Sequence, residues 1–376
     1  MKIVFFCGSL EPGRDGVGDY VRRLAAELSQ QGHEPAAIAL SDHHLQQEIS
    51  TGPEAGAVAL PLLRLPASWP MRRRLQRAQE WTDAFGPEWL SLQFVPFAFH
   101  PRGLAYNLGK HLARLGRGRS WHLMVHELWV GMDAEAPLKH RWWGKLQRYL
   151  INAMITDLRP KLIHTQTSLY QAQLAKLGFS SHLLPLFANI PNTSLARPVS
   201  VAGEESRTVS LVIFGSIHAG APVAQFAHDA AQYARENAVP VKLTMIGRCG
   251  KEQETWAASW RAVGLPVEIL GEQTPDFISQ VLWQSSLGVA TTPVDVIGKS
   301  GTAAAMLEHG LPVLCVAHPW FPIGIAPPTP PNRVSVYKEG NFAAYLVGKT
   351  RELNPNPSAE IARKLLDSLQ AVPVSA

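Results

Sequence analysis

The sequence predicts an α/β protein built from two doubly wound parallel sheets, and three observations lead to this fold class. Short apolar runs alternate with amphipathic stretches over most of the chain, which is the pattern of parallel strands covered by helices on both faces. The alternation stops once, between 187 and 208, and then begins again. With 376 residues, the chain is also long enough for two domains, since domains rarely exceed roughly 250 residues.

Composition limits the kinds of partner that we expect. The hydrophobic content of 46% supports large cores, and the charged content of 17% argues against extended disorder. The formal net charge of +5 is compatible with an anionic partner such as a nucleotide or a phospholipid surface. We expect no nucleic-acid partner, because the sequence contains no compact Lys/Arg array with base-stacking aromatic residues.

The cysteines and the apolar runs predict a cytoplasmic protein without a disulfide framework or a zinc site. Three cysteines, far apart in the sequence, fit neither a disulfide framework nor a zinc site. The apolar run at 1–8 is too short for a signal peptide and is typical of a first strand. No run approaches the ~18 apolar residues that a membrane-spanning helix needs.

The predicted N-terminal domain covers residues 1–188. It opens with a strand at 2–7, a glycine-rich loop at 8–15, a helix at 17–31 and a strand at 35–40, as nucleotide-binding sheets do. Glycines at 13, 16 and 18 do not follow the G-x-G-x-x-G spacing, so we expect no dinucleotide cofactor. Further strands are predicted at 89–95, 121–125, 161–165 and 182–186, and further helices at 69–85, 104–115, 138–158 and 168–177.

Residues 189–208 are predicted to link the domains, because their Pro, Gly and Glu residues show no periodicity. The C-terminal domain is predicted over 209–353, followed by a terminal helix and tail at 354–376. Its predicted strands are 210–214, 241–246, 267–270, 287–291 and 313–316. Helices are predicted at 223–237, 252–263, 275–284, 342–353 and 359–369, and loops at 292–298 and at the Pro-rich stretch 318–333.

The stretch from Gly298 to Leu314 is the main candidate for a phosphate site. It reads as a loop, an Ala-rich helix that Ser300 can cap, a turn at Gly310 and a strand. A loop of small residues that opens a helix presents N–H groups and the positive end of the helix dipole, and Lys299 adds a cation. An ordinary capped turn between a strand and a helix has the same pattern, so both interpretations remain open.

Six short motifs follow one another along nearly the whole chain. They are Gly16-Val17-Gly18-Asp19-Tyr20, Gln31-Gly32-His33-Glu34, His126-Glu127, Asn189-Ile190-Pro191, Phe214-Gly215-Ser216 and Gly310-Leu311-Pro312-Val313. In their order and spacing, the chain resembles glycosyltransferases of the GT-B fold, and among these most of all the large retaining family 4. Each motif alone is weak, and the resemblance rests on the set.

The resemblance implies two Rossmann-like domains that face a deep cleft. The N-terminal domain would mostly hold the acceptor, and the C-terminal domain would hold a nucleoside-diphosphate sugar. It implies transfer of the sugar with retention of configuration and without a bound metal, because positive groups of the protein neutralise the leaving diphosphate. The sugar nucleotide is then a substrate rather than a cofactor, and the acceptor is a glycan, a lipid or a small molecule.

The resemblance also assigns roles to individual residues. His126, where a strand opens toward ligands, and Glu127 would be catalytic: His126 would bond the donor sugar, and Glu127 would act as a base if the strand has ended there. The alternative for His126 is a structural histidine. Residues expected to bind the substrate are Gly16, Val17, Gly18, Ser216, His218, Arg248, Glu272, Asp295, Lys299, Ser300, Gly301 and Thr302. For Asp295 the alternative is an ion pair with Lys299, and for Arg248 it is a solvated side chain.

The sequence departs from the family pattern at two places. The E-x7-E pattern of family 4 would place acids near Ile297 and Ala305, and neither residue is acidic. The usual Arg and Lys after the first strand of the second domain are replaced by the segment 215–220. Two other interpretations therefore stand beside a transferase: a non-catalytic GT-B protein that binds a nucleotide sugar or a partner, and a GT-B sugar-nucleotide epimerase.

Two basic stretches that carry tryptophan, 69–77 and 139–148, have the composition of helices that lie on a membrane surface. Such a contact would be peripheral and at the inner face of the membrane. Solvated faces of two ordinary helices are the alternative interpretation of the same pattern.

Overall fold

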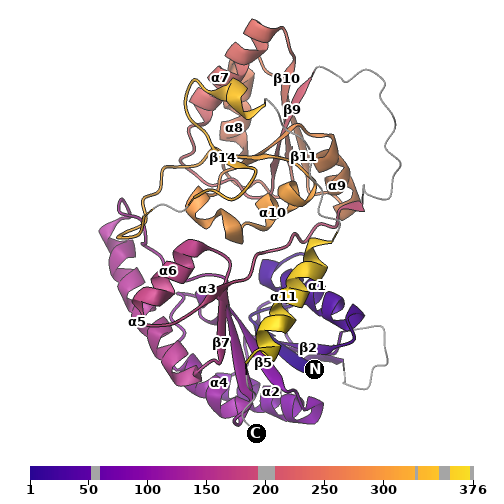
Figure 1. Ribbon diagram of the computed structural model, residues 1–376, viewed down its shortest axis with the longest axis vertical. Coiled ribbons are helices and arrows are strands. Elements are labelled where there is room, and N and C mark those ends of the chain that lie inside the picture. The colour runs from indigo at the N-terminus through magenta and orange to yellow at the C-terminus, as the bar shows by residue number, and fades with distance from the viewer. Residues whose placement is uncertain (52–59, 194–207, 327–328, 347–355, 373–376) are drawn as a thin grey trace. The chain divides into compact units, whose positions relative to one another are not determined.

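The computed structural model describes residues 1–51, 60–193, 208–326, 329–346 and 356–372 (Figure 1). The chain divides into two compact units, here called the N-terminal unit and the C-terminal unit. The N-terminal unit consists of Met1–Pro185, Phe321–Ala326 and Ser358–Ala376, and the C-terminal unit consists of Leu186–Trp320 and Pro327–Pro357. Most of the predicted linker, 194–207, lies outside the described residues.

The N-terminal unit is built on one eight-stranded sheet with the order β3-β4-β2-β1-β5-β6-β7-β8. All neighbouring strands pair in parallel except β3 and β4, which are antiparallel. The strands are β1 (Lys2–Cys7), β2 (Glu34–Asp42), β3 (Ile49–Thr51), β4 (Leu62–Pro66), β5 (Trp89–Phe94), β6 (Ser120–Val125), β7 (Leu162–Thr165) and β8 (His182–Leu183). The sequence analysis did not predict β3 and β4, and it predicted β8 three residues too long.

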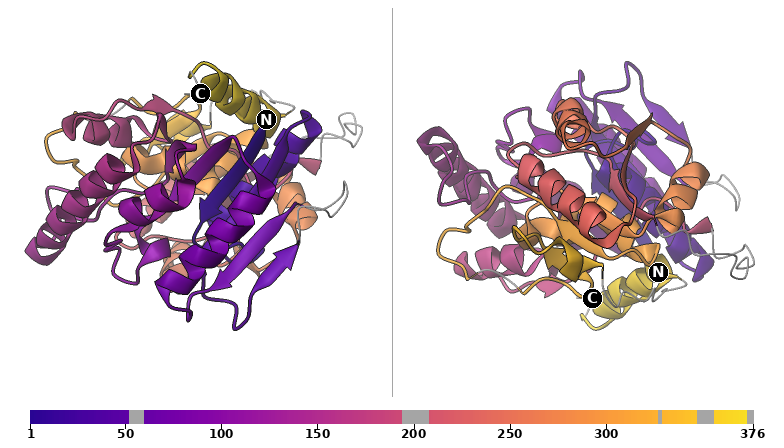
Figure 2. Two further views of the ribbon diagram at one scale, coloured as in Figure 1. Left: turned by 90° about the horizontal axis from the view of Figure 1, so that it is seen from below. Right: turned by 90° about the horizontal axis from the view of Figure 1, so that it is seen from above.

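Helices cover both faces of this sheet (Figure 2). They are α1 (Gly16–Gln30), α2 (Met71–Phe85), α3 (Pro96–Phe99), α4 (Leu108–Gly116), α5 (Leu138–Leu158), α6 (Ser168–Lys176) and α11 (Pro357–Gln370). The last helix returns to the first: the Ser358 hydroxyl donates to Glu27 Oε1 at 2.7 Å, and Gln31 Nε2 donates to the Ala359 carbonyl at 3.2 Å. The end of the chain therefore belongs to the N-terminal unit.

The helix predicted at 104–115 begins only at Leu108, and the residues before it form turns. The His100 ring nitrogen Nδ1 accepts from the N–H groups of Arg102 and Leu104 at 3.1 and 3.3 Å. Asn107 then has a left-handed backbone with φ of 54°. Side-chain acceptors compete with helix formation in this way, which is why apolar periodicity alone extended the helix too far.

The C-terminal unit is built on a six-stranded, fully parallel sheet with the order β11-β10-β9-β12-β13-β14. The strands are β9 (Val209–Phe214), β10 (Val241–Ile246), β11 (Val267–Gly271), β12 (Leu287–Ala290), β13 (Val313–Cys315) and β14 (Val334–Val336). The helices are α7 (Val223–Asn237), α8 (Gln253–Ala262), α9 (Pro275–Gln284), η2 (Val294–Lys299), α10 (Gly301–Glu308) and η3 (Phe342–Tyr345).

Alternate residues of the strands supply two hydrophobic cores, one on each face of this sheet. Leu211 and Ile213 of β9 pack in the core that includes α7 and α8, whereas Val212 packs in the core that includes α9 and α10. This period of two is the pattern expected of a strand buried on both faces. The continuous apolar runs that predicted a parallel sheet have this origin.

The sequence predictions for the region after residue 291 differ from the structure at four places. The predicted loop at 292–298 is mostly the 3-10 helix η2, and β14 was not predicted. The helix predicted at 342–353 is described only to 346 and there contains the short 3-10 helix η3; the remainder lies outside the described residues. Part of the predicted loop at 318–333, Phe321–Ala326, belongs to the N-terminal unit, where the Ala134 N–H donates to the Phe321 carbonyl at 2.8 Å.

Candidate active site

Four strand ends of the C-terminal unit bring most of the predicted site residues to one edge of its sheet. β11, β10, β9 and β12 are parallel, so the loops that follow them emerge on the same side. The chain leaves β9 toward β10 but leaves β12 toward β13, which makes the edge between β9 and β12 a topological switch point, where open α/β sheets bind ligands. These loops carry Ser216, His218, Arg248, Glu272, Asp295, Lys299, Ser300, Gly301 and Thr302.

Glycines with a left-handed backbone turn the chain at three of these strand ends. Gly215, Gly247 and Gly271 have φ values of +77°, +89° and +65°, a region that favours glycine. A Cβ atom on Gly215 would lie 2.6 Å from Cγ2 of Thr302. Glycine at this position therefore lets the loop after β9 lie directly against the first turn of α10.

Ser300 caps α10 as the sequence predicts. Its Oγ accepts from the Ala303 N–H at 3.3 Å and lies 3.1 Å from Oγ1 of Thr302. The N–H of Ser300 itself donates to the Ile297 carbonyl at 2.9 Å, so this N–H group is already bonded. The predicted role of Ser300 in substrate binding stays a prediction. Gly301 and Thr302 stand in the first turn, where N–H groups have no intrahelical acceptor.

His218 and Lys299 stand in the two loops beside this helix start. The N–H of His218 donates to Oγ1 of Thr291 at 2.8 Å, which holds the loop after β9 against the loop after β12. Burial and the positive charge of Lys299 lower the pKa of His218 below its usual 6.5. The imidazole is therefore neutral at pH 7, and Lys299 supplies the positive charge at this position.

Asp295 is a buried acid in the loop that leads to Lys299. Its side chain is only 6% exposed, and Oδ1 has no hydrogen-bond partner among the described residues. Burial raises its pKa above the usual 3.8. The ion pair with Lys299 that was the alternative interpretation is not found among the described residues. A buried carboxylate oxygen without a hydrogen-bond partner costs stability, and a buried acid with a shifted pKa is a candidate for a functional site.

Arg248 and Glu272 contact each other at the outer end of the same edge. The distance from Nε of Arg248 to Oε2 of Glu272 is 3.6 Å, and both side chains are more than half exposed. Exposed ion pairs contribute little to stability. The pair lies at the ends of the neighbouring strands β10 and β11, and its predicted role in substrate binding stays a prediction.

The positions where family 4 would place its acids are part of the core. Ile297 and Ala305 are both buried in the core formed with α9 and α10. The nearby acid Glu308 has a structural role, because its Oε1 accepts from the Ala188 N–H at 2.6 Å. The departure from the E-x7-E pattern is therefore accommodated by apolar packing of the two positions.

In the N-terminal unit, His126 follows β6 and is enclosed by two glutamines. Its Nε2 lies 2.8 Å from Oε1 of Gln93 and its Nδ1 lies 3.0 Å from Nε2 of Gln166, so Nε2 carries the proton and Nδ1 accepts. The side chain is 5% exposed, and burial lowers its pKa to about 4. Both ring nitrogens are bonded within the unit, which favours a structural histidine, and the catalytic role stays a prediction.

Glu127 lies two residues beyond the end of β6, and its backbone N–H donates to the Phe94 carbonyl at 3.4 Å. The strand has therefore ended before this residue, which was the condition for Glu127 to act as a base. Its side chain is half-buried. The role itself stays a prediction.

A chain of buried polar side chains continues from His126 across the sheet. Gln93 Nε2 donates to Ser91 Oγ at 2.7 Å, and that hydroxyl bonds His122 Nδ1 at 2.7 Å. His122 Nε2 then lies 3.0 Å from His164 Nδ1. Each side chain from His126 to His164 can therefore donate a hydrogen bond to the next one in the chain. The sequence analysis missed this network, although polar residues at alternate positions of apolar strands were a usable signal.

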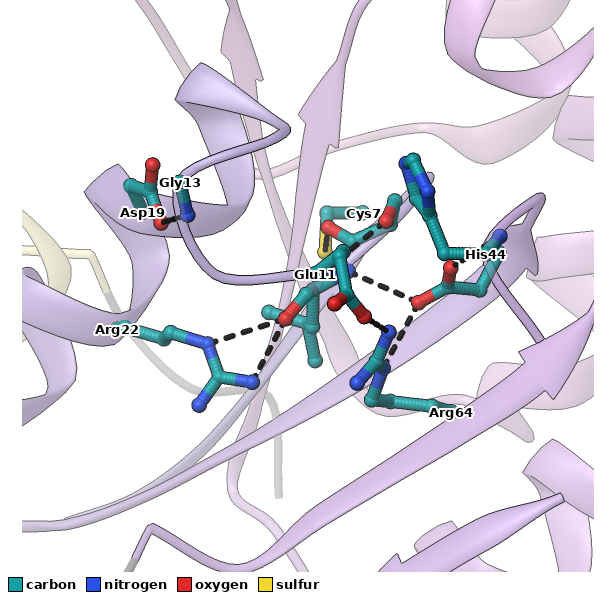
Figure 3. Close-up of polar contacts among 10 residues, drawn as sticks. Cys7, Glu11, Gly13, Asp19, Arg22, His44 and Arg64 are labelled. Atoms are coloured by element: carbon teal, nitrogen blue, oxygen red, sulfur yellow. Dashed lines mark hydrogen bonds and ion pairs between the residues drawn. The ribbon is translucent and has the colours of Figure 1, made fainter. Parts of the chain in front are cut away.

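The loop after β1 is held from two sides (Figure 3). Arg22 of α1 donates to the Leu10 carbonyl from Nε at 3.2 Å and from Nη2 at 2.7 Å. Arg64 of β4 bonds Oδ2 of Asp42 at 2.8 Å and also pairs with Glu11. The buried Arg64 in β4 is thus neutralised by acids of β2 and of the loop.

Of the three predicted residues at the start of α1, Gly18 is buried for a structural reason. Its N–H donates to Oδ1 of the cap residue Asp15 at 2.7 Å. A Cβ atom on Gly18 would lie 2.6 Å from the Ser9 carbonyl oxygen, whereas a Cβ atom on Gly16 would meet nothing within 4 Å. The close backbone approach at Gly18 is therefore to the protein's own loop; Gly16 is exposed and Val17 half-buried.

Two classes of feature are absent from the part of the chain that the structure describes. No helix there is long and apolar enough to cross a membrane. The same described residues contain no group of three or more His, Cys, Asp or Glu side chains placed to hold a metal ion.

No protein-family model matches the sequence, and no curated protein matches it significantly. Solved structures do match. HepE from Anabaena, in complex with UDP and glucose, has 14% sequence identity and a TM-score of 0.59 over 99% of this chain and 100% of that one. The lipopolysaccharide outer core galactosyltransferase WaaB has 14% identity and a TM-score of 0.53 over 97% of this chain and 95% of that one.

An epimerase structure matches to a similar extent. A putative UDP-N-acetylglucosamine 2-epimerase from Listeria monocytogenes has 9% identity and a TM-score of 0.52 over 99% of this chain and 96% of that one. At such low identities the likeness concerns the fold. The two parallel-sheet units thus make up the GT-B fold that glycosyltransferases and sugar-nucleotide epimerases share.

Proposed function

We propose that the protein transfers a sugar from a nucleoside-diphosphate sugar to an acceptor, and that the C-terminal unit binds the donor. The observation that carries this proposal is that Lys299, the start of α10 and His218 all belong to the loops at the switch point between β9 and β12, where the charge of Lys299 acts on His218. HepE is described with UDP and with UDP-glucose. Uridine nucleotides are therefore the first donors to test.

The chemistry at this edge suits a departing diphosphate. Negative charge develops on the diphosphate as the glycosidic bond breaks, and fixed positive groups lower the free energy of that transition state. We assign this role to the Lys299 ammonium group, the N–H groups of Gly301 and Thr302 and the dipole of α10. The neutral His218 adds a hydrogen-bond donor without adding charge.

Two finer points of the proposal rest on the resemblance to family 4. We propose that the configuration at the transferred sugar is retained, and that the protein's own positive groups suffice without a metal ion. The acceptor is a glycan, a lipid or a small molecule. Full activity in the presence of a chelator is the result expected for the metal-independent reaction.

Two other functions remain alternatives, each with an observation in its favour. Ile297 and Ala305 stand in the core instead of acids, which favours a protein that binds a nucleotide sugar without catalysis. The likeness to an epimerase fold is almost as close as the likeness to WaaB, which favours a sugar-nucleotide epimerase. We propose no separate cofactor for any of these three functions, because the nucleotide sugar is itself the substrate or the ligand.

One experiment separates these functions. The protein is incubated with UDP-glucose, UDP-galactose and UDP-N-acetylglucosamine, and the thermal shift, the release of UDP and the sugar products are recorded. We expect stabilisation by at least one donor together with slow release of UDP. Stabilisation without any turnover indicates a binding protein, and a new sugar nucleotide without release of UDP indicates an epimerase. No binding of any nucleoside diphosphate or its sugars would contradict the proposal.

A further inference from the structure

Helix α5 exposes a row of large apolar side chains to solvent. Leu138, Trp142 and Tyr149 are 70%, 68% and 68% exposed, and Leu146 is 40% exposed. The spacings of four, four and three residues place these side chains on one side of a helix with about 3.6 residues per turn. We call these four residues the α5 stripe.

The opposite side of α5 packs on the N-terminal unit, so the stripe is not part of the core. The buried residues of the helix are Gly144, Gln147, Ile151, Met154, Ile155 and Leu158. Oε1 of Gln147 accepts from the Val130 N–H at 2.9 Å, and Nε1 of Trp143 donates to the Arg102 carbonyl at 3.1 Å. These contacts fix which side of the helix faces solvent. A solvent-facing side normally carries polar residues, so large apolar side chains there indicate a binding surface.

Cations flank the α5 stripe. The exposed basic side chains are Lys139, Arg141, Lys145 and Arg148, none of which forms an ion pair with a described residue. No acidic residue occurs in the helix before Asp157. Nζ of Lys145 lies 4.2 Å from the ring centroid of Trp142. The surface is thus both apolar and strongly positive.

The other basic stretch with tryptophan differs in this respect. In α2, Arg74 is buried and donates to the carbonyls of Leu40 at 2.6 Å and Trp69 at 3.0 Å. Arg77 pairs with Glu48 at 2.8 Å. These two cations of α2 serve the fold, and Arg73 packs over the ring of Trp69, with Cζ 3.4 Å from the ring centroid. In α5, by contrast, all four basic side chains are exposed, and none forms an ion pair with a described residue.

We propose that the α5 stripe lies on the surface of an anionic phospholipid bilayer and attaches the N-terminal unit to it peripherally. An interfacial helix carries Trp and apolar residues on the side that enters the headgroup region, with Lys and Arg beside them. Negatively charged lipid headgroups complement the four cations of α5. This proposal does not depend on the proposed sugar transfer, because the donor loops belong to the C-terminal unit.

The test is co-sedimentation of the full chain with vesicles of phosphatidylcholine alone and of an equimolar mixture with phosphatidylglycerol. We expect binding only to the anionic vesicles, and release at high ionic strength, which screens the cations. Trp142→Ser with Tyr149→Ser, and separately Arg141→Glu with Lys145→Glu, should each weaken the binding by at least about tenfold.

Matched controls lie away from the α5 stripe. Phe277 is an aromatic side chain of α9 that is 40% exposed, and Phe277→Ser should leave vesicle binding unchanged. Lys110→Glu with Lys251→Glu reverses two exposed charges elsewhere and should reduce binding much less than the α5 pair. Equal binding to neutral and anionic vesicles, or equal effects of the control pair and the α5 pair, would overturn the proposal.

A second measurement does not depend on the stability of the variants. Brominated lipids should quench part of the tryptophan fluorescence of the wild type, and Trp142→Phe should remove that quenched part while vesicle binding persists.

The alternative partner for the α5 stripe is a second copy of this chain. A dimer in solution that Trp142→Ser with Tyr149→Ser dissociates, together with no binding to anionic vesicles, would assign the stripe to a dimer interface and refute the membrane proposal.

Discussion

At the scale of single residues, the two glycines at the start of α1 differ in whether the structure has room for a side chain. A Cβ atom on Gly18 would meet the Ser9 carbonyl oxygen at 2.6 Å, and this backbone oxygen cannot move aside without disturbing the loop. Gly18→Ala should therefore lower the free energy of unfolding by roughly 1 to 3 kcal/mol. Gly16→Ala is the matched control, because the space around Gly16 is open and alanine favours the helix.

Urea unfolding of the two variants measures the difference. We expect the midpoint for Gly18→Ala to fall clearly below that of the wild type, and the midpoint for Gly16→Ala to stay equal or rise slightly. Similar midpoints for both variants would show that the loop relaxes around the new methyl group.

Some residue-level features follow from the sequence, and others need the fold. The cap at Ser300 was predictable, since a small polar residue before an Ala-rich stretch has one obvious acceptor role. The partners of His126 were not, because Gln93 reaches it from β5 and Gln166 from the residue that follows β7. Local pattern cannot show which distant polar residue becomes a neighbour, so His126 was interpreted from its strand-end position alone.

At the scale of elements, the buried histidines of β6 and β7 should make the N-terminal unit sensitive to acid. Burial lowers the pKa values of His126 and His164 to about 4, and burial and neighbouring histidines lower the pKa of His122 well below its usual value. Unfolded histidines titrate near 6.5, so between pH 6.5 and 4 the unfolded chain binds more protons than the folded one. Stability is therefore complete above pH 6.5 and falls as the pH drops toward 4.

We expect each of these histidines to cost about 1 kcal/mol of stability between pH 7 and pH 5.5. Urea titrations at the two pH values measure the total loss, and the nitrogen chemical shifts of the imidazoles measure the protonation state. All three rings should remain neutral, with the proton on Nε2, at pH 5.5. Charged rings at that pH in the folded protein would contradict the buried network.

Elements with strong periodicity were predictable and short ones were not. α5, α7 and α9 have the predicted bounds, because their apolar residues recur at helical spacing. β4 was missed, since Arg64 interrupts its apolar run. The buried charge of Arg64 is tolerated because it forms ion pairs with Asp42 of β2 and with Glu11 of the loop after β1. β3 and β14 have three residues each, too few for a period to be recognised.

At the scale of the whole molecule, two alternating strand–helix series predicted two parallel sheets, and both are present. The return of α11 to the N-terminal unit was not predictable. Its contacts with Glu27 and Gln31 join residues at opposite ends of the chain, and nothing in the local sequence of α11 specifies them. The sequence likewise did not predict the order of the strands in either sheet. This order decides where the switch point of the C-terminal sheet lies, and therefore which loops form the proposed donor site.

The measurement that tests the central claim most directly is calorimetric titration of Lys299→Ala with UDP and with uridine. Lys299 stands at the start of α10 beside His218, so its loss should weaken binding of the diphosphate while leaving the affinity for the nucleoside nearly unchanged. We expect a loss of roughly tenfold or more for UDP, the size typical of a charge-assisted contact. Lys251→Ala, which removes an exposed lysine of the same unit, should bind both ligands like the wild type. Equal weakening for UDP and uridine, or no weakening for UDP, would contradict a diphosphate site at this edge of the C-terminal sheet.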